Sequence, residues 1–180
     1  NGHVEVVSVL LEEGADIDKD MNDGATPLYV ASQQGHGEVV SVLLEQGADI
    51  DKACDDGATP LHVASQQGHV EVVRMLLERG ADIDKARDSG ATPLFIASQN
   101  GHVEVAKLLI EAGADIDKAK DDGITPLYVA SQQGHVDVAR VLLDCGADAT
   151  LAASNGMTPL MIAKQMNRHE IVSLLEAVAK

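Results

Sequence analysis

The sequence repeats itself every 33 residues, and this period constrains the fold more than any other feature. The tripeptide Thr-Pro-Leu begins at Thr26, Thr59, Thr92, Thr125 and Thr158. Gly-His and Gly-Ala-Asp markers keep the same spacing without an insertion. A fixed period of about 20–50 residues is typical of stacked-repeat proteins, in which each unit packs only on its neighbours.

The first half of one unit, residues 54–86, predicts a turn followed by a short helix. Asp55-Asp56-Gly57 has the composition of a tight turn, in which glycine adopts a conformation that other residues resist. Thr59 is suited to cap a helix, and Pro60 fits the first helical position, where no N–H is needed. The helix is predicted over 61–67 because a glycine follows it.

A second helix is predicted over 70–79, again ended by a glycine. Its apolar residues recur at helical spacing and define one face: Val72, Val73, Leu76 and Leu77. Neither helix can bury such a face alone, so the units must stack.

The segment DGATPLHVASQQGHVEVVRMLLERGADIDKA (56–86) resembles the ankyrin repeat at nearly every framework position, and the likeness covers essentially the whole chain. The resemblance implies an all-α solenoid of helix-turn-helix units, with β-turn fingers projecting beside a concave groove. One departure from the family pattern is a serine in place of the second alanine. We expect its hydroxyl to bond a backbone carbonyl one turn earlier, at Ser32, Ser65, Ser98 and Ser131.

The period divides the chain into a partial first repeat, four full repeats and a terminal unit: 1–20, 21–53, 54–86, 87–119, 120–152 and 153–180. The first unit lacks its leading helix, which suggests truncation from a longer array. Its uncapped face is expected to self-associate weakly through Val6, Val7, Leu10 and Leu11. Residues 153–180 are interpreted as a C-terminal cap, because Asn167-Arg168 replaces Gly-His and Glu176 replaces an apolar residue.

The net charge of −16, from 29 acidic and 13 basic residues, argues against nucleic acid and anionic membranes as partners. It favours a basic protein segment, although the acids could serve solubility alone. No apolar run is long enough to cross a bilayer, and no signal peptide is evident, which predicts an intracellular protein, cytoplasmic or nuclear. Cys54 and Cys145 have no CxxC partner and are interpreted as reduced thiols.

Repetition also argues against an active site, since an active site is normally built once. Adjacent repeat units lie about 10 Å apart, so the equivalent histidines of two repeats are too far apart to share a zinc ion. The histidines are instead expected to bond locally between the two helices of a repeat: His3, His36, His69, His102 and His135. The finger acids do not match a calcium loop, and no phosphate-binding glycine loop is present. We predict no enzyme activity, metal or cofactor, with weak cation binding by the fingers left open.

In ankyrin-repeat proteins, partners usually contact the finger tips and the exposed side of the first helix. Carried over to this chain, the candidate contact positions are Asn22, Asp23, Tyr29, Gln33, Gln34, Asp55, Asp56, Ala58, His62, Gln66, Gln67, Asp88, Ser89, Ala91, Phe95, Gln99, Asn100, Asp121, Asp122, Ile124, Tyr128, Gln132 and Gln133. An acidic rim with amides would suit an extended basic peptide, with Tyr29, Phe95 and Tyr128 as the predicted anchors.

Other hypotheses remain beside specific protein binding. Gln-Gln and Asp-Asp recur between repeats, as expected of a recently duplicated or designed array that was never tuned to one partner. The chain could then be a structural spacer, or a targeting module for an attached enzyme. The resemblance also implies possible hydroxylation targets in the fingers, at Asp18, Asp51, Asp84 and Asp117.

Overall fold

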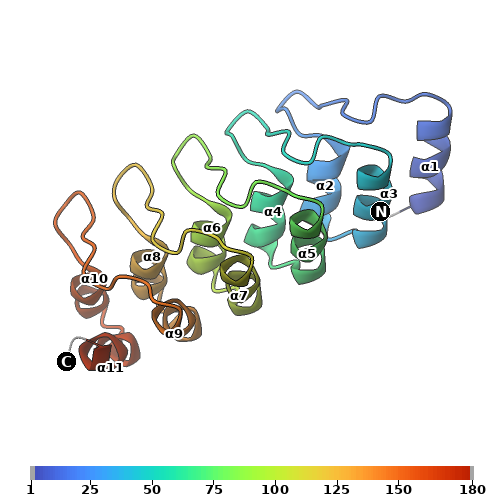
Figure 1. Ribbon diagram of the computed structural model, residues 1–180. Coiled ribbons are helices and arrows are strands. Elements are labelled where there is room, and N and C mark those ends of the chain that lie inside the picture. The colour runs from blue at the N-terminus through green and yellow to red at the C-terminus, as the bar shows by residue number, and fades with distance from the viewer. Residues whose placement is uncertain (1–2, 179–180) are drawn as a thin grey trace.

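The computed structural model describes residues 3–178 as a solenoid of stacked helix pairs with loops projecting to one side (Figure 1). One row contains the first helices of the repeats: α2 (Pro27–Gln34), α4 (Pro60–Gln67), α6 (Pro93–Asn100), α8 (Pro126–Gln133) and α10 (Pro159–Gln165). The other row contains the second helices: α1 (Val4–Glu12), α3 (Gly37–Glu45), α5 (Val70–Glu78), α7 (Val103–Glu111), α9 (Val136–Asp144) and α11 (His169–Val178). The predicted all-α solenoid is confirmed. The predicted boundaries at residues 1 and 180 lie outside the described residues.

The core is a repeated layer of leucine, valine and alanine. First helices pack on first helices along one row, and α1, α3, α5, α7, α9 and α11 pack along the other. Each full repeat buries the same leucines completely or nearly so, at Leu28, Leu43, Leu61, Leu76, Leu94, Leu109, Leu127 and Leu142. Burial therefore depends on the stack, because each layer is closed by its neighbours.

The ends of the first helices are set by the residues that the sequence singled out. Thr59 has extended backbone angles, and its hydroxyl accepts the N–H of His62. Pro60 occupies the first helical position. Gly68 ends α4 with a φ of 76°, in the left-handed region that glycine favours. The capping predictions are confirmed.

The Gly-His pair joins one repeat to the next, which corrects the expectation of a local bond between the two helices of one repeat. The Nε2–H of His102 donates to the backbone oxygen of Gln66, 2.8 Å away in the preceding repeat. His69 and His135 make the same bond at 3.1 and 3.0 Å. A Cβ added to Gly68 would lie 2.6 Å from the His102 ring, so the glycine makes room for the histidine.

The framework serines differ from one another. The Ser131 hydroxyl donates to the oxygen of Leu127 at 2.7 Å, as expected for a serine one turn along a helix. The hydroxyls of Ser32, Ser65 and Ser98 are buried and have no hydrogen-bond partner among the described residues. The predicted back-bond is therefore formed once among the four positions.

The two ends of the stack leave apolar side chains uncovered. Val6 and Leu10 of α1 are more than half exposed, and Met161 of α10 is 53% exposed. At the last repeat, the Glu176 carboxylate lies 2.8 Å from the Lys164 amine. Over the described residues, no helix is both long enough and apolar enough to span a membrane.

Candidate protein-binding surface

The fingers are the loops that precede each first helix, and backbone hydrogen bonds join three pairs of neighbouring fingers. Within one finger, the Asp56 carboxylate accepts the N–H of Ala58 at 2.9 Å. Between fingers, the N–H of Asp55 donates to the backbone oxygen of Asp23 at 3.0 Å, and the N–H of Asp88 donates to that of Asp56 at 3.1 Å. These bonds hold successive finger tips in a row along one edge of the solenoid (Figure 1).

A second line of inter-repeat bonds runs through the acids at the end of each unit. Both carboxylate oxygens of Asp51 accept the N–H of Asp82, each at 3.1 Å. The Lys85 amine donates to the backbone oxygen of Asp51 at 2.8 Å. The same carboxylate bonds are made by Asp18, Asp84 and Asp117. These four aspartates, matched above to hydroxylation targets, are therefore half-buried links of the stack.

The candidate contact positions divide into three groups by exposure. Thirteen are exposed, namely Asn22, Asp23, Gln34, Asp55, Asp56, Gln67, Asp88, Ser89, Gln99, Asn100, Asp121, Asp122 and Gln133. Five are half-buried, namely Tyr29, Gln33, Gln66, Ile124 and Gln132. Five are buried, namely Ala58, His62, Ala91, Phe95 and Tyr128.

The buried group corrects the predicted aromatic anchors. Phe95 and Tyr128 are each 3% exposed, and His62 is fully buried. Phe95 packs with Val129 of the following repeat, and Tyr128 packs with Ile162. Phe95 and Tyr128 both stand at the third position of their helices, and there each packs against the first helix of the following repeat. Tyr29 alone among the predicted anchors is partly accessible.

His62 shows how a polar ring is accommodated in this interface. Its Nδ1 accepts the N–H of Thr59 at 3.2 Å, and its Nε2–H donates to the backbone oxygen of Ala91 at 3.0 Å. Burial lowers the pKa of His62 to about 4, since the charged form would lose its hydration. The ring is a neutral link between repeats at physiological pH.

Two first residues of repeats, Arg87 and Lys120, partly neutralise finger acids, and the sequence alone did not single them out. Arg87 Nη1 lies 3.7 Å from an Asp56 oxygen, and its Nη2 donates to the Gln66 side chain at 3.1 Å. The Cys54 thiol donates to Asp56 at 2.9 Å, and this bond is the main cause that lowers the pKa of Asp56. The sequence does mark this position, because the first residue differs in every one of these otherwise similar units: Met21, Cys54, Arg87, Lys120 and Ala153.

Lys120, the first residue of the following repeat, pairs with an acid of its own finger. Its amine lies 5.4 Å from the centre of the Phe95 ring and 3.3 Å from an oxygen of Asp122. The first contact is a cation–π interaction, and the second is a surface ion pair. Lys120 therefore lies over the ring of Phe95 in the repeat before it.

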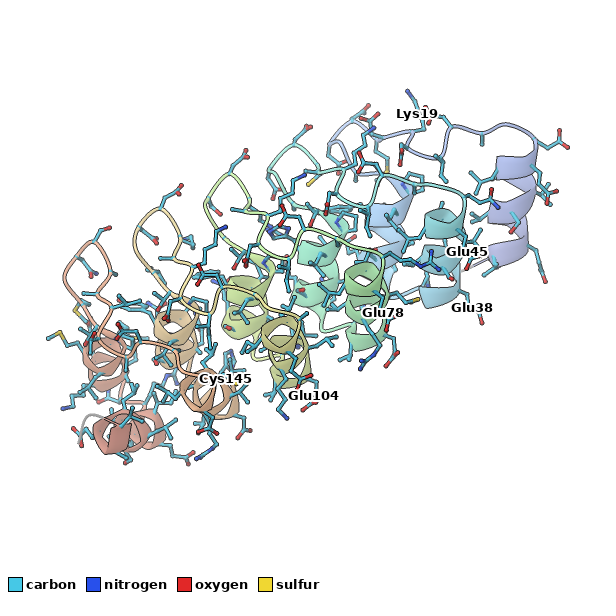
Figure 2. The ribbon with its side chains drawn as sticks, in the orientation of Figure 1. Lys19, Glu38, Glu45, Glu78, Glu104 and Cys145 are labelled. Carbon is cyan, nitrogen blue, oxygen red and sulfur yellow. The ribbon has the colours of Figure 1, made fainter. Side chains whose placement is uncertain are left out.

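Three finger-tip acids remain without such a partner. Asp55, Asp88 and Asp121 are exposed, and their carboxylates make no hydrogen bond or ion pair among the described residues. A line of exposed amides follows at the C-terminal ends of the first helices, at Gln34, Gln67, Asn100 and Gln133. Figure 2 shows that Glu38, Glu78 and Glu104 lie on the second helices, away from the fingers. The chain thus presents separate acidic rows on its finger side and on its outer helices.

Histidine, cysteine and acidic side chains are dispersed over residues 3–178. No group of three histidine, cysteine or acidic side chains there could hold a metal ion. Cys54 and Cys145 are free thiols, and Cys145 is exposed beyond α9 (Figure 2).

Comparison with known families agrees with the geometry. A family model described as "Ankyrin repeats (3 copies)" matches four overlapping segments, 1–87, 51–120, 84–153 and 116–178. A search of curated proteins found no match.

Proposed function

The chain belongs to the ankyrin-repeat family, and we propose that it binds a basic protein or peptide segment along its finger tips and first helices. Ankyrin-repeat domains are generally protein-interaction modules and are typically non-catalytic. On this proposal the chain holds no cofactor and contributes a surface, not a reaction.

The observation that carries the proposal is the row of unpaired carboxylates at Asp55, Asp88 and Asp121. Each of these side chains projects from a finger whose backbone is hydrogen-bonded to at least one neighbouring finger, so little conformational entropy is lost when a partner binds. Their spacing is fixed by the stack, at about 10 Å between neighbours. An extended segment with lysine or arginine at matching intervals could pair with several of them at once.

The amides supply the second half of the proposed surface. Gln67 and Gln133 are exposed at the ends of first helices, where they can donate to and accept from the backbone of an extended segment. Tyr29 is the accessible aromatic position in the first full repeat. The rings of Phe95 and Tyr128 are buried and are not part of this surface.

Two charge-matched variants test the proposal. One replaces the finger acids, as Asp55→Asn, Asp88→Asn and Asp121→Asn. The control replaces three exposed acids of the second helices in the same repeats, as Glu71→Gln, Glu104→Gln and Asp137→Asn. Each chain is used to capture proteins from cell extract at low and high salt, after circular dichroism confirms its helix content.

We expect a protein that is retained by the parent and the control, lost by the finger variant, and weakened by salt. Retention by the finger variant but not by the control would place binding on the outer helices and contradict the proposal. The absence of any specific partner from several extracts would favour the spacer hypothesis.

A further inference from the structure

In each full repeat, the third residue of the first helix lies at the joint with the following repeat. These residues are Tyr29, His62, Phe95 and Tyr128. Of the four, His62 alone can take up a proton near or below neutral pH. It is fully buried where α4 packs on α6, two helices that lie side by side in Figure 1. We call this interface, between repeats 54–86 and 87–119, the His62 joint.

The hydrogen bonds of the His62 ring require its neutral form. Nδ1 accepts the N–H of Thr59 at 3.2 Å, and Nε2–H donates at 3.0 Å to the backbone oxygen of Ala91, at the end of the following finger. The Thr59 hydroxyl lies 2.8 Å from Nδ1, but it already accepts the backbone N–H of His62 as the helix cap. A proton on Nδ1 would therefore deprive the Thr59 N–H of its acceptor and place a charge where water is excluded.

The charged groups around the ring do not compensate for such a charge. Arg87 of the following finger and Lys85 before it disfavour a second positive charge, whereas Asp56 favours it. Asp56 is already engaged, 3.7 Å from Arg87 and 2.9 Å from the Cys54 thiol. Tyr29 on the preceding helix stays neutral, because burial raises the pKa of its hydroxyl. Helix α6 carries no charged side chain, and the charged side chains of α5 are exposed.

Other bonds hold the His62 joint without the ring. The Nε2–H of His102 donates to the backbone oxygen of Gln66 at 2.8 Å. The Asp84 carboxylate accepts the N–H of Asp115 at 3.1 Å. Loss of the ring's own bonds would therefore loosen the joint beside the finger and the first helix without separating the two repeats.

The histidines that follow the first helices differ from His62. His69, His102 and His135 bond the preceding repeat through Nε2–H, a donor that a protonated ring retains. All three are half-buried, so a charged ring there keeps part of its hydration. Protonation of these rings preserves their contacts between repeats.

We propose that the His62 joint is an acid-sensitive hinge of the solenoid: a proton on the His62 ring releases α4 from the following finger, while the other bonds keep the two repeats stacked. The equivalent joints lack this response because Tyr29, Phe95 and Tyr128 carry no charge in acid. The fingers on either side of the hinge would change their spacing when it opens. The hinge does not depend on what the fingers bind, so it and the proposed function fail independently.

Amide hydrogen exchange at three joints tests the hinge, because each of three finger amides bonds the preceding finger. The Asp88 N–H makes this bond at the His62 joint, and the Asp55 and Ser154 N–H groups make it at the joints of Tyr29 and Tyr128. After correction for intrinsic exchange rates, the protection of the Asp88 amide should fall at least about tenfold from pH 7 to pH 4. The protection of the other two amides should change by less than about twofold.

Two variants assign the effect to the ring. His62→Phe introduces the residue found at this position in the next repeat, and it should keep the Asp88 amide protected at pH 4. Adding Tyr128→His to that variant places a histidine beside Thr125, the cap of α8, and should move the acid sensitivity to the Ser154 amide. Circular dichroism at both pH values checks that each chain keeps its helix content.

Three results would overturn the proposal. The first is a fall in protection at Asp88 no greater than at the other two joints of the parent chain. The second is a fall at Asp88 that persists in His62→Phe. The third is a folded double variant whose Ser154 amide remains insensitive to acid.

Discussion

At the scale of single residues, the repeat is maintained by positions that look alike but have different tasks. Gly68 and Gly80 both have positive φ, at 76° and 87°. A Cβ at Gly68 would meet the His102 ring, whereas a Cβ at Gly80 would meet nothing within 4 Å. Gly80 therefore allows a turn, and Gly68 allows both a turn and a contact between repeats.

This difference predicts unequal costs for the same substitution. Gly80→Ala should lower the free energy of unfolding by about 1 kcal/mol, the cost of an unfavourable φ. Gly68→Ala should cost at least about 1 kcal/mol more, because it also displaces His102 and its 2.8 Å bond to Gln66. Urea denaturation of the two variants measures this, and equal losses would contradict the assigned contact.

His62 predicts a dependence of stability on pH. Its folded pKa of about 4 lies below the ordinary value of 6.5, so the unfolded chain binds the proton more readily. The contribution of the neutral ring is therefore present above pH 6.5 and is lost as the pH falls toward 4. The shift corresponds to about 3 kcal/mol.

The matched variant is His62→Phe, which introduces the residue found at the equivalent position, Phe95. As the pH falls from 7 to 4, the unfolding free energy of the parent should fall further than that of the variant. A constant difference over this range would show that His62 does not carry the effect. Titration of the His62 ring by NMR provides an independent measurement.

At the scale of elements, the sequence predicted the helices well because their signals are local. Thr59 and Pro60 mark the start of α4, and Gly68 marks its end, so both boundaries fall within one residue of the prediction. The site was predicted less well, because burial of Phe95 and Tyr128 depends on the neighbouring repeat. The partners of Arg87 are likewise in the preceding repeat and leave no local pattern.

The hydrogen bonds between units also leave no pattern within a single helix. Their loss should lower the free energy of unfolding. Asp51→Ala removes both acceptors of the Asp82 N–H and should lower the free energy of unfolding by about 1–2 kcal/mol. Asp51→Asn keeps one oxygen acceptor and should recover part of the loss. Denaturant unfolding measures both variants, and a loss below about 0.5 kcal/mol for Asp51→Ala would indicate that the bond contributes little.

At the scale of the whole molecule, stability should depend on the number of layers more than on any surface residue. Deletion of the repeat 54–86 removes one period and leaves the pattern of the stack intact. The variant should fold, and its denaturant m-value should fall by roughly a fifth, in proportion to the surface buried. Glu78→Gln, an exposed change within the same repeat, should alter stability by less than about 0.5 kcal/mol.

The outcome is read from urea unfolding of the parent, the deletion and Glu78→Gln. An unchanged midpoint in the deletion variant would show that the removed layer did not couple its neighbours. Residues 153–180 are proposed to cap the array.

The central claim, that the finger side is the binding surface, is tested most directly by hydrogen exchange on the chain with and without its captured partner. We expect slower exchange in the fingers and first helices, over 54–67, 87–100 and 120–133, and unchanged exchange in the second helices α5, α7 and α9. Protection confined to those second helices, with the fingers unchanged, would contradict it.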